Sequence, residues 1–125
     1  MCGIVGIYFK KKKLHNKLGK YLSGMLDNMS SRGPDSAGFA IYNNDTKKFY
    51  KYSLCINDKS IINEFEVDIK NKFKDLTIKS VSDHLVIQTL SNPKIVIPYI
   101  KKKYDNILIV GYGKSIEIFK QVGNP

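Results

Sequence analysis

The residue best suited to chemistry in this sequence is Cys2, which directly follows the initiator Met1. A small second residue favours removal of the initiator, and Cys2 would then be the first residue of the chain. A free α-amine has an unperturbed pKa of about 7.7–8.0, so part of it is neutral at cellular pH. It can take up the thiol proton, directly or through a water, as in enzymes whose N-terminal residue is the nucleophile. Cys2 is therefore a candidate nucleophile, although this start, taken alone, more often belongs to a structural cysteine.

The other chemically capable residues form no motif in the sequence. Cys55 lies at an expected strand end among polar residues and is interpreted as a packing cysteine. His15 and His84 have no partners at metal-ligand spacing, so we expect an exposed helix-start residue and a strand-edge residue. Residues 111–115 lie between two expected elements but lack the glycine spacing of a phosphate loop. We therefore expect no metal and no cofactor in this chain.

The elements around Cys2 follow from the pattern of apolar residues in the first half of the chain. Residues 2–9 are apolar and β-branched, which predicts a buried strand, and their two glycines suggest a close approach to its backbone. Apolar residues at helical spacing predict a helix over residues 15–30, which Gly33 and Pro34 would end. Two strands, 38–42 and 48–54, are expected to form a hairpin around a polar turn.

The second half of the chain shows alternating helix and strand signals. Helices are expected at 60–73 and 92–104, with Pro98 kinking or shortening the latter, and strands at 76–81, 85–90 and 106–110. Residues 115–122 are predicted to form a short helix. We find no internal repeat and no linker, so residues 1–125 are expected to form one domain of the α+β class.

Composition and charge narrow the classes of function. No apolar run approaches the roughly 20 residues that span a bilayer, and the N-terminal apolar run precedes its lysines, unlike a signal peptide. With two cysteines and no export signal, a cytoplasmic location is expected. The net charge is +10, but 20 of the 21 cations are lysines. Because base readout relies on arginine forks, a nucleic-acid-binding module is a minor alternative, and we expect neither nucleic acid nor membrane as a partner.

Two motifs at this separation resemble a known family. Residues 1–7 read MCGIVGI and residues 31–38 read SRGPDSAG, with a helix expected between them. This combination resembles the class II glutamine amidotransferases, whose catalytic domain has the N-terminal-nucleophile hydrolase fold, an αββα sandwich. Segments 17–26, 32–42, 83–89, 115–118 and 122–123 look like one branch, the stand-alone subunits related to archaeal-type glutamate synthase and N-methylglutamate synthase. The resemblance covers essentially the whole chain and is strongest in its first third.

The resemblance implies a mechanism and a partner. Cys2 would attack the side-chain carboxamide of glutamine, ammonia would leave for a synthase subunit, and the glutamyl thioester would be hydrolysed to glutamate. Arg32, the only arginine, lies in a segment that borders the glutamine site in relatives, so a substrate-positioning role is expected. An Arg32–Asp35 brace of the loop is the structural alternative. Asp35 and Ser36 are interpreted chiefly as turn and strand-start residues.

Some expected features of the family are missing from these 125 residues. Family members carry a His-Thr-Arg-like segment that grips the glutamine carboxylate, an Asn-Gly pair that forms the oxyanion hole and an aspartate that holds the substrate amine. Neither His-Thr-Arg nor Asn-Gly occurs here. We therefore expect the N-terminal portion of a truncated domain, with a partial αββα sandwich that a C-terminal part or a second chain completes. The alternative is a family remnant without activity that acts as an interaction or regulatory module.

Overall fold

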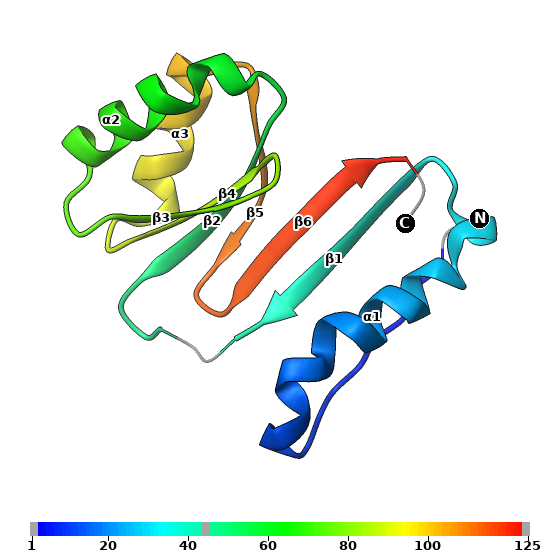
Figure 1. The fold of residues 1–125 in the computed structure, drawn as a ribbon. Helices are drawn as coiled ribbons and strands as arrows, with labels where there is room; N and C mark the ends of the chain where they lie inside the picture. The colour runs from blue at the N-terminus through cyan, green and yellow to red at the C-terminus, as the bar shows by residue number, and fades with distance from the viewer. Residues whose placement is uncertain (1–2, 44–45, 124–125) are drawn as a thin grey trace. The chain divides into compact units, whose positions relative to one another are not determined.

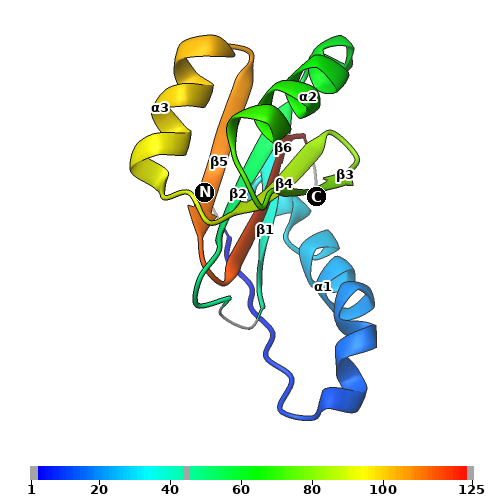
Figure 2. The same cartoon turned by 90° about the vertical axis from the view of Figure 1, so that its left-hand side faces the viewer.

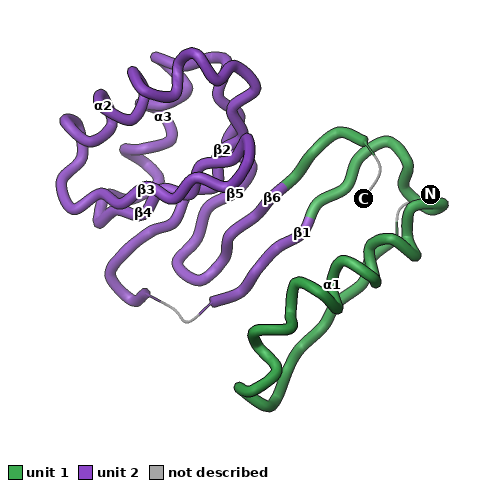
Figure 3. The backbone as a smooth tube through the Cα atoms, viewed as in Figure 1, with its two compact units in different colours: residues 1–38, 120–125 green, residues 39–119 purple. Residues whose placement is uncertain are grey.

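The computed structural model describes residues 3–43 and 46–123. It contains both helices and antiparallel sheets, which confirms the α+β class (Figure 1). The chain divides into two compact units: residues 1–38 with 120–125 form unit 1, and Phe39–Phe119 form unit 2 (Figure 3). None of the described helices has the length and the apolar character needed to cross a membrane.

Unit 2 is built on a four-stranded antiparallel sheet in the order β3-β4-β2-β5. Its strands are β2 (Tyr50–Ile56), β3 (Thr77–Val81), β4 (His84–Thr89) and β5 (Ile107–Gly113). All four were predicted, with ends within about three residues, because their apolar and β-branched residues favour a pleated surface. The register between β2 and β5 shifts between Ser53 and Leu54, so the two strands are irregular at this point.

Two helices cover one face of this sheet, and the hydrophobic core lies between the helices and the sheet (Figure 2). They are α2 (Ile62–Lys72) and α3 (Pro93–Lys103), both near their predicted positions. The Asn92 side chain caps α3 by accepting a hydrogen bond from the Lys94 amide at 2.9 Å, and the helix continues through Pro98. Apolar side chains from both helices and from β2, β4 and β5 fill the space between them: Tyr52, Leu54, Ile56, Phe65, Ile69, Phe73, Leu85, Ile87, Val96, Ile100, Tyr104 and Ile107.

A second sheet consists of β1 (Ser36–Tyr42) and β6 (Ile116–Val122). Two predictions are therefore wrong. The helix predicted over 115–122 is instead the strand Ile116–Val122, because its apolar residues also fit a period of two and β1 supplies a hydrogen-bonding partner. The expected hairpin of β1 with β2 does not form, since β1 pairs with β6 and β2 pairs with β4 and β5; turn residues 44–45 lie outside the described residues.

Within unit 2, residues 116–119 of β6 pack against the sheet face opposite the helices. The Ile118 amide donates a hydrogen bond to Ser53 Oγ at 2.8 Å. Gly111 lies beneath this contact, and a Cβ atom there would collide with Ile118 Cδ1 and lie 3.3 Å from Ile118 Cγ1. The glycine therefore permits the close approach of β6 to β5.

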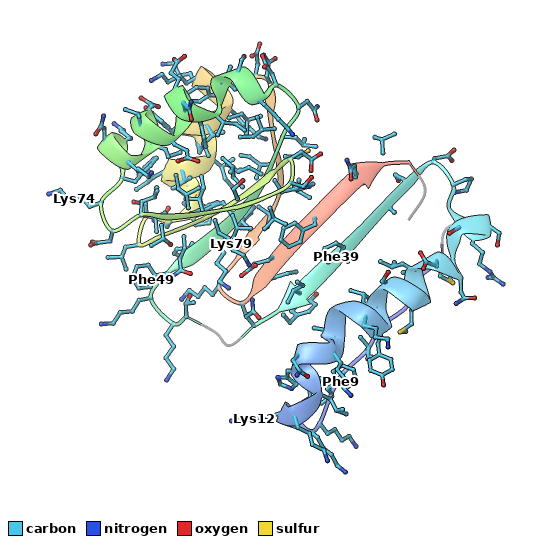
Figure 4. The ribbon with its side chains drawn as sticks, in the orientation of Figure 1. Phe9, Lys12, Phe39, Phe49, Lys74 and Lys79 are labelled. Atoms are coloured by element: carbon cyan, nitrogen blue, oxygen red, sulfur yellow. The ribbon has the colours of Figure 1, made fainter. Side chains whose placement is uncertain are left out.

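Unit 1 contains an N-terminal segment and a helical region. Residues 3–9 run beside α1 (Leu18–Asp27), with Phe9 (labelled in Figure 4) packed edge-to-face on Tyr21 at 5.6 Å. The predicted buried strand over 2–9 is wrong for its described residues, which are exposed or half-buried and have no strand pairing. The predicted helix 15–30 is shorter, with 3₁₀ turns at Lys12–Lys17 and Ser30–Arg32 on either side. The apolar periodicity thus predicted the helix correctly but placed both of its ends too far out.

Candidate functional site

The predicted nucleophile Cys2 lies outside the described residues, so the candidate site is traced from its neighbour Gly3. A Cβ atom at Gly3 would collide with Met29 Cε and would lie 3.5 Å from both Cβ and Cδ of Arg32. The absence of a side chain at Gly3 therefore lets the backbone next to Cys2 pack on the end of α1 and on the turn that follows.

Unit 1 places Arg32 beside the residue that follows Cys2. Arg32 ends the 3₁₀ turn, where its amide donates a hydrogen bond to the Met29 carbonyl at 2.9 Å. Its side chain is exposed. The aliphatic stem lies against Gly3, which leaves the guanidinium able to meet a ligand from solvent. The substrate-positioning role that the resemblance implies for Arg32 stays a prediction.

The structure also bears on the alternative role of Arg32 as a loop brace. Among the described residues, no ion pair joins Arg32 to Asp35. Asp35 instead uses its backbone carbonyl, which accepts a hydrogen bond from the Gly123 amide at 3.0 Å. Ser36 is the first residue of β1, as the strand-start interpretation requires.

Unit 2 contains a buried polar network that the sequence analysis missed. The Lys51 ammonium and the Glu117 carboxylate are 2.7 Å apart, and both side chains are only 8% exposed. Asn43 Nδ2 donates to the same carboxylate at 3.0 Å, and Lys79 (labelled in Figure 4) lies 3.9 Å from it. Burial raises the pKa of Glu117, but the hydrogen bond and charge of Lys51, with Lys79 and Asn43, outweigh it, so the pKa is lowered.

Little in the sequence indicated that Lys51 and Glu117 form a buried pair. Lys51 lies in β2 and Glu117 in β6, and charged residues at such alternating positions usually face solvent. They are buried because β6 packs over the sheet, a contact that the helix prediction for 115–122 did not allow. The pair is a structural feature of unit 2.

A second polar cluster brings Cys55 and His84 together. These residues face each other in the register of β2 and β4, and Asp83 precedes His84 in the turn between β3 and β4. Candidate ligand atoms of Cys55, Asp83 and His84 all lie within 4.8 Å of one another. His84 is the first residue of β4, at the edge of the strand as expected, and it is buried because β4 is an internal strand of the sheet. His15 is exposed, as expected.

Comparison with known proteins gives two relatives that span this chain. One is the glutamine amidotransferase-like protein GlxB of Rhizobium meliloti, 35% identical over 100% of the chain and 42% of its own length. The other, from Methanothermobacter thermautotrophicus, is named provisionally as a glutamine amidotransferase. It is 32% identical over 99% of the chain and 44% of its own length. No protein-family model matches the chain, and no solved structure gives a significant match.

These relatives support a relationship with glutamine amidotransferases. The similarity runs through essentially the whole chain, as the sequence motifs predicted. The chain spans less than half the length of each relative.

Proposed function

We propose that this chain carries the nucleophile of a class II glutamine amidotransferase and performs the glutaminase half-reaction. The observation that carries the proposal is the packing of Arg32 on Gly3, which sets the only arginine beside the residue next to Cys2. The two named relatives support the general activity. The N-terminal-nucleophile αββα fold, the glutamate-synthase-related branch and a cytoplasmic location belong to the same proposal.

In the proposed reaction, Cys2 becomes the first residue after Met1 is removed. Its α-amine accepts the thiol proton, and Sγ attacks the carboxamide carbon of glutamine. Collapse of the tetrahedral intermediate breaks the C–N bond, and the amide nitrogen leaves as ammonia with the transferred proton. Water then attacks the thioester, which releases glutamate and restores the thiol.

Arg32 has the chemistry to bind the glutamine substrate. A guanidinium presents a planar fork of donors that matches a carboxylate in a bidentate pair, which an ammonium cannot reproduce. Its exposed position and its stem on Gly3 would place this fork at the border of the glutamine site near Cys2. The grip on the α-carboxylate that a His-Thr-Arg-like segment provides in the family would come from the completing part. Arg32 would thus orient the carboxamide and take no part in bond breaking.

The proposal includes a partner. Ammonia released beside a synthase subunit can be transferred before it is protonated in bulk water, so we propose a synthase that receives it. The reaction needs oxyanion donors, because removal of one such donor typically costs at least about a hundredfold in rate. Since residues 1–125 contain no Asn-Gly pair, we propose that a C-terminal part or a second chain supplies the donors.

The test is covalent labelling of the full chain with a glutamine-like diazoketone, 6-diazo-5-oxo-norleucine, followed by intact-mass and peptide mass spectrometry. We expect loss of Met1 and one label on Cys2, with Cys55 unlabelled. Cys55 is a matched internal control, because burial and then the charge of Asp83 raise the pKa of its thiol, which leaves it less nucleophilic.

Two variants make the outcome decisive. Cys2→Ser removes the proposed nucleophile and should abolish labelling, whereas Cys55→Ser should leave it unchanged. Retention of Met1, or equal labelling of the two cysteines, would contradict the proposal and favour the interaction-module alternative. Excess glutamine should slow the labelling of Cys2 if the reagent occupies the glutamine site.

A further inference from the structure

The cluster of Cys55, Asp83 and His84 in unit 2 is unconnected with the proposed amidotransferase chemistry. Thiolate and imidazole are the ligands that zinc-class cations prefer over magnesium or calcium. The three side chains come from two strands and one turn of the same sheet. Their candidate ligand atoms all lie within 4.8 Å of one another.

The fold holds the three side chains in place. Cys55 and His84 are directly opposed in the antiparallel register of β2 and β4, so their side chains project from the same sheet face. Only two residues, Ser82 and Asp83, join β3 to β4. The Ile56 amide donates a hydrogen bond to the Asp83 carbonyl at 2.9 Å, which ties this turn to β2.

The burial and contacts of the cluster suit a single ion. The exposed fraction is 5% for the His84 side chain and 20% for that of Asp83, so an ion could enter from the Asp83 side. The His84 ring lies 5.5 Å from that of Phe119, which limits its rotation. The Asp83 carboxylate already lies 2.7 Å from His84 Nδ1, and Cys55 Sγ lies 3.7 Å from Asn57 Oδ1.

We propose that Cys55, Asp83 and His84 bind one zinc-class divalent cation through a thiolate, a carboxylate oxygen and a ring nitrogen. Two anionic ligands neutralise the dication, and the Cys55 thiol proton is released to water on binding. At ordinary zinc bond lengths, tetrahedral ligand atoms lie roughly 3.3–3.5 Å apart. Binding would therefore require side-chain rotations that bring the three ligand atoms, now within 4.8 Å of one another, to this spacing. Three protein ligands leave a fourth position for water.

The probe is Co²⁺, whose thiolate charge-transfer absorption reports a cysteine ligand. Tag-free, chelator-treated full chain is titrated with Co²⁺ and then with competing Zn²⁺. We expect the absorption band to appear with one Co²⁺ per chain and to be removed by Zn²⁺. It should be absent in Cys55→Ser and retained in Cys2→Ser, which removes the other cysteine.

Further variants test the remaining ligands. His84→Gln and Asp83→Asn should each weaken Co²⁺ binding by roughly tenfold or more, whereas His15→Gln, at an exposed histidine in unit 1, should bind as the wild type does. Circular dichroism checks folding, and the isosteric Asp83→Asn carries the test if His84→Gln does not fold. Zn²⁺, but not Mg²⁺, should raise the thermal midpoint of the wild type.

Three results would overturn the proposal. They are the lack of a thiolate band in the wild type at millimolar Co²⁺, a band that survives in Cys55→Ser, and unchanged affinity in both His84→Gln and Asp83→Asn. None of them bears on Cys2 labelling, so the metal site and the amidotransferase proposal can fail independently.

Discussion

At the scale of single residues, a substitution of Arg32 tests whether this side chain binds the substrate. Arg32→Lys keeps the positive charge but removes the planar fork. A hydrogen bond to a charged group contributes about 1.5–3 kcal/mol, so its loss should raise the half-saturating concentration of the diazoketone roughly tenfold or more. The maximal rate of Cys2 labelling should stay close to that of the wild type, because Arg32 does not act on the reacting bonds.

The matched control for this prediction is Lys20→Ala, which removes an exposed cation from α1. The concentration dependence of labelling, followed by intact mass, separates binding from chemistry. Equal half-saturating concentrations in Arg32→Lys and the wild type would show that Arg32 does not contact the substrate, and the loop would then need another explanation.

At the same scale, the Lys51–Glu117 pair should control part of the stability of unit 2. Removing one partner of a buried ion pair leaves the other charge uncompensated, which typically costs about 3–5 kcal/mol. Glu117→Ala should therefore lower the free energy of unfolding by roughly this amount in urea denaturation at neutral pH. The double variant Lys51→Met/Glu117→Leu should be less destabilised, because no charge remains buried. Equal destabilisation of the two would contradict this explanation.

The lowered pKa of Glu117 also predicts a pH dependence. Because the folded state holds the pKa of Glu117 below its ordinary value of 4.5, the unfolded state binds the proton more readily. The contribution of Glu117 to stability is present above pH 4.5 and is lost as the pH falls from there through the lower folded value. Urea denaturation across this acidic range should show a smaller loss of stability in Glu117→Gln. Parallel curves for the two proteins would count against this contribution.

At the scale of elements, the packing of β6 on β5 can be tested by comparing two glycine-to-alanine substitutions whose expected effects on stability are opposite. Gly111→Ala would push a methyl group into Ile118, and such overpacking costs roughly 1–3 kcal/mol. Gly24 lies within α1, and among the described residues, apart from its two chain neighbours and the backbone of its own helix, no atom comes within 4 Å of the place that a Cβ would take. Gly24→Ala should therefore be neutral or stabilising by up to about 1 kcal/mol, since alanine favours a helix.

Thermal denaturation followed by circular dichroism measures both glycine variants. The opposite signs matter more than the magnitudes, because both changes add the same methyl group. If Gly111→Ala were as stable as the wild type, β6 would not approach β5 as closely as the structure shows, and the burial of Glu117 would be in doubt as well.

At the scale of the whole molecule, the two compact units differ in how many of their side chains are buried. Every side chain of the described core belongs to unit 2, and no described residue of unit 1 falls in the buried class. Regions with few buried apolar contacts open locally at low free-energy cost. Hydrogen exchange measured by mass spectrometry should therefore give amide protection in α1 at least about a hundredfold lower than in β2 and β4. Similar protection would show that unit 1 is stabilised by contacts other than those described.

The sequence by itself determined most elements of unit 2 and supplied the candidate nucleophile. The helices around Phe65 and Ile100 and the strands around Tyr52 and Ile87 follow from local apolar periodicity, which needs no knowledge of the fold. Cys2 is the candidate nucleophile because an N-terminal cysteine carries its own base, and the motif pair around Cys2 and Arg32 predicts the relationship with glutamine amidotransferases that the two relatives support.

Only the tertiary structure decided which strands pair and which polar residues meet. Residues 116–122 fit both a helical and an alternating pattern, and their pairing with β1 selects the strand. Lys51 meets Glu117, and Cys55 meets His84, because strand packing and register bring distant segments together. Local spacing cannot encode such contacts, since they depend on which sheet face another part of the chain covers.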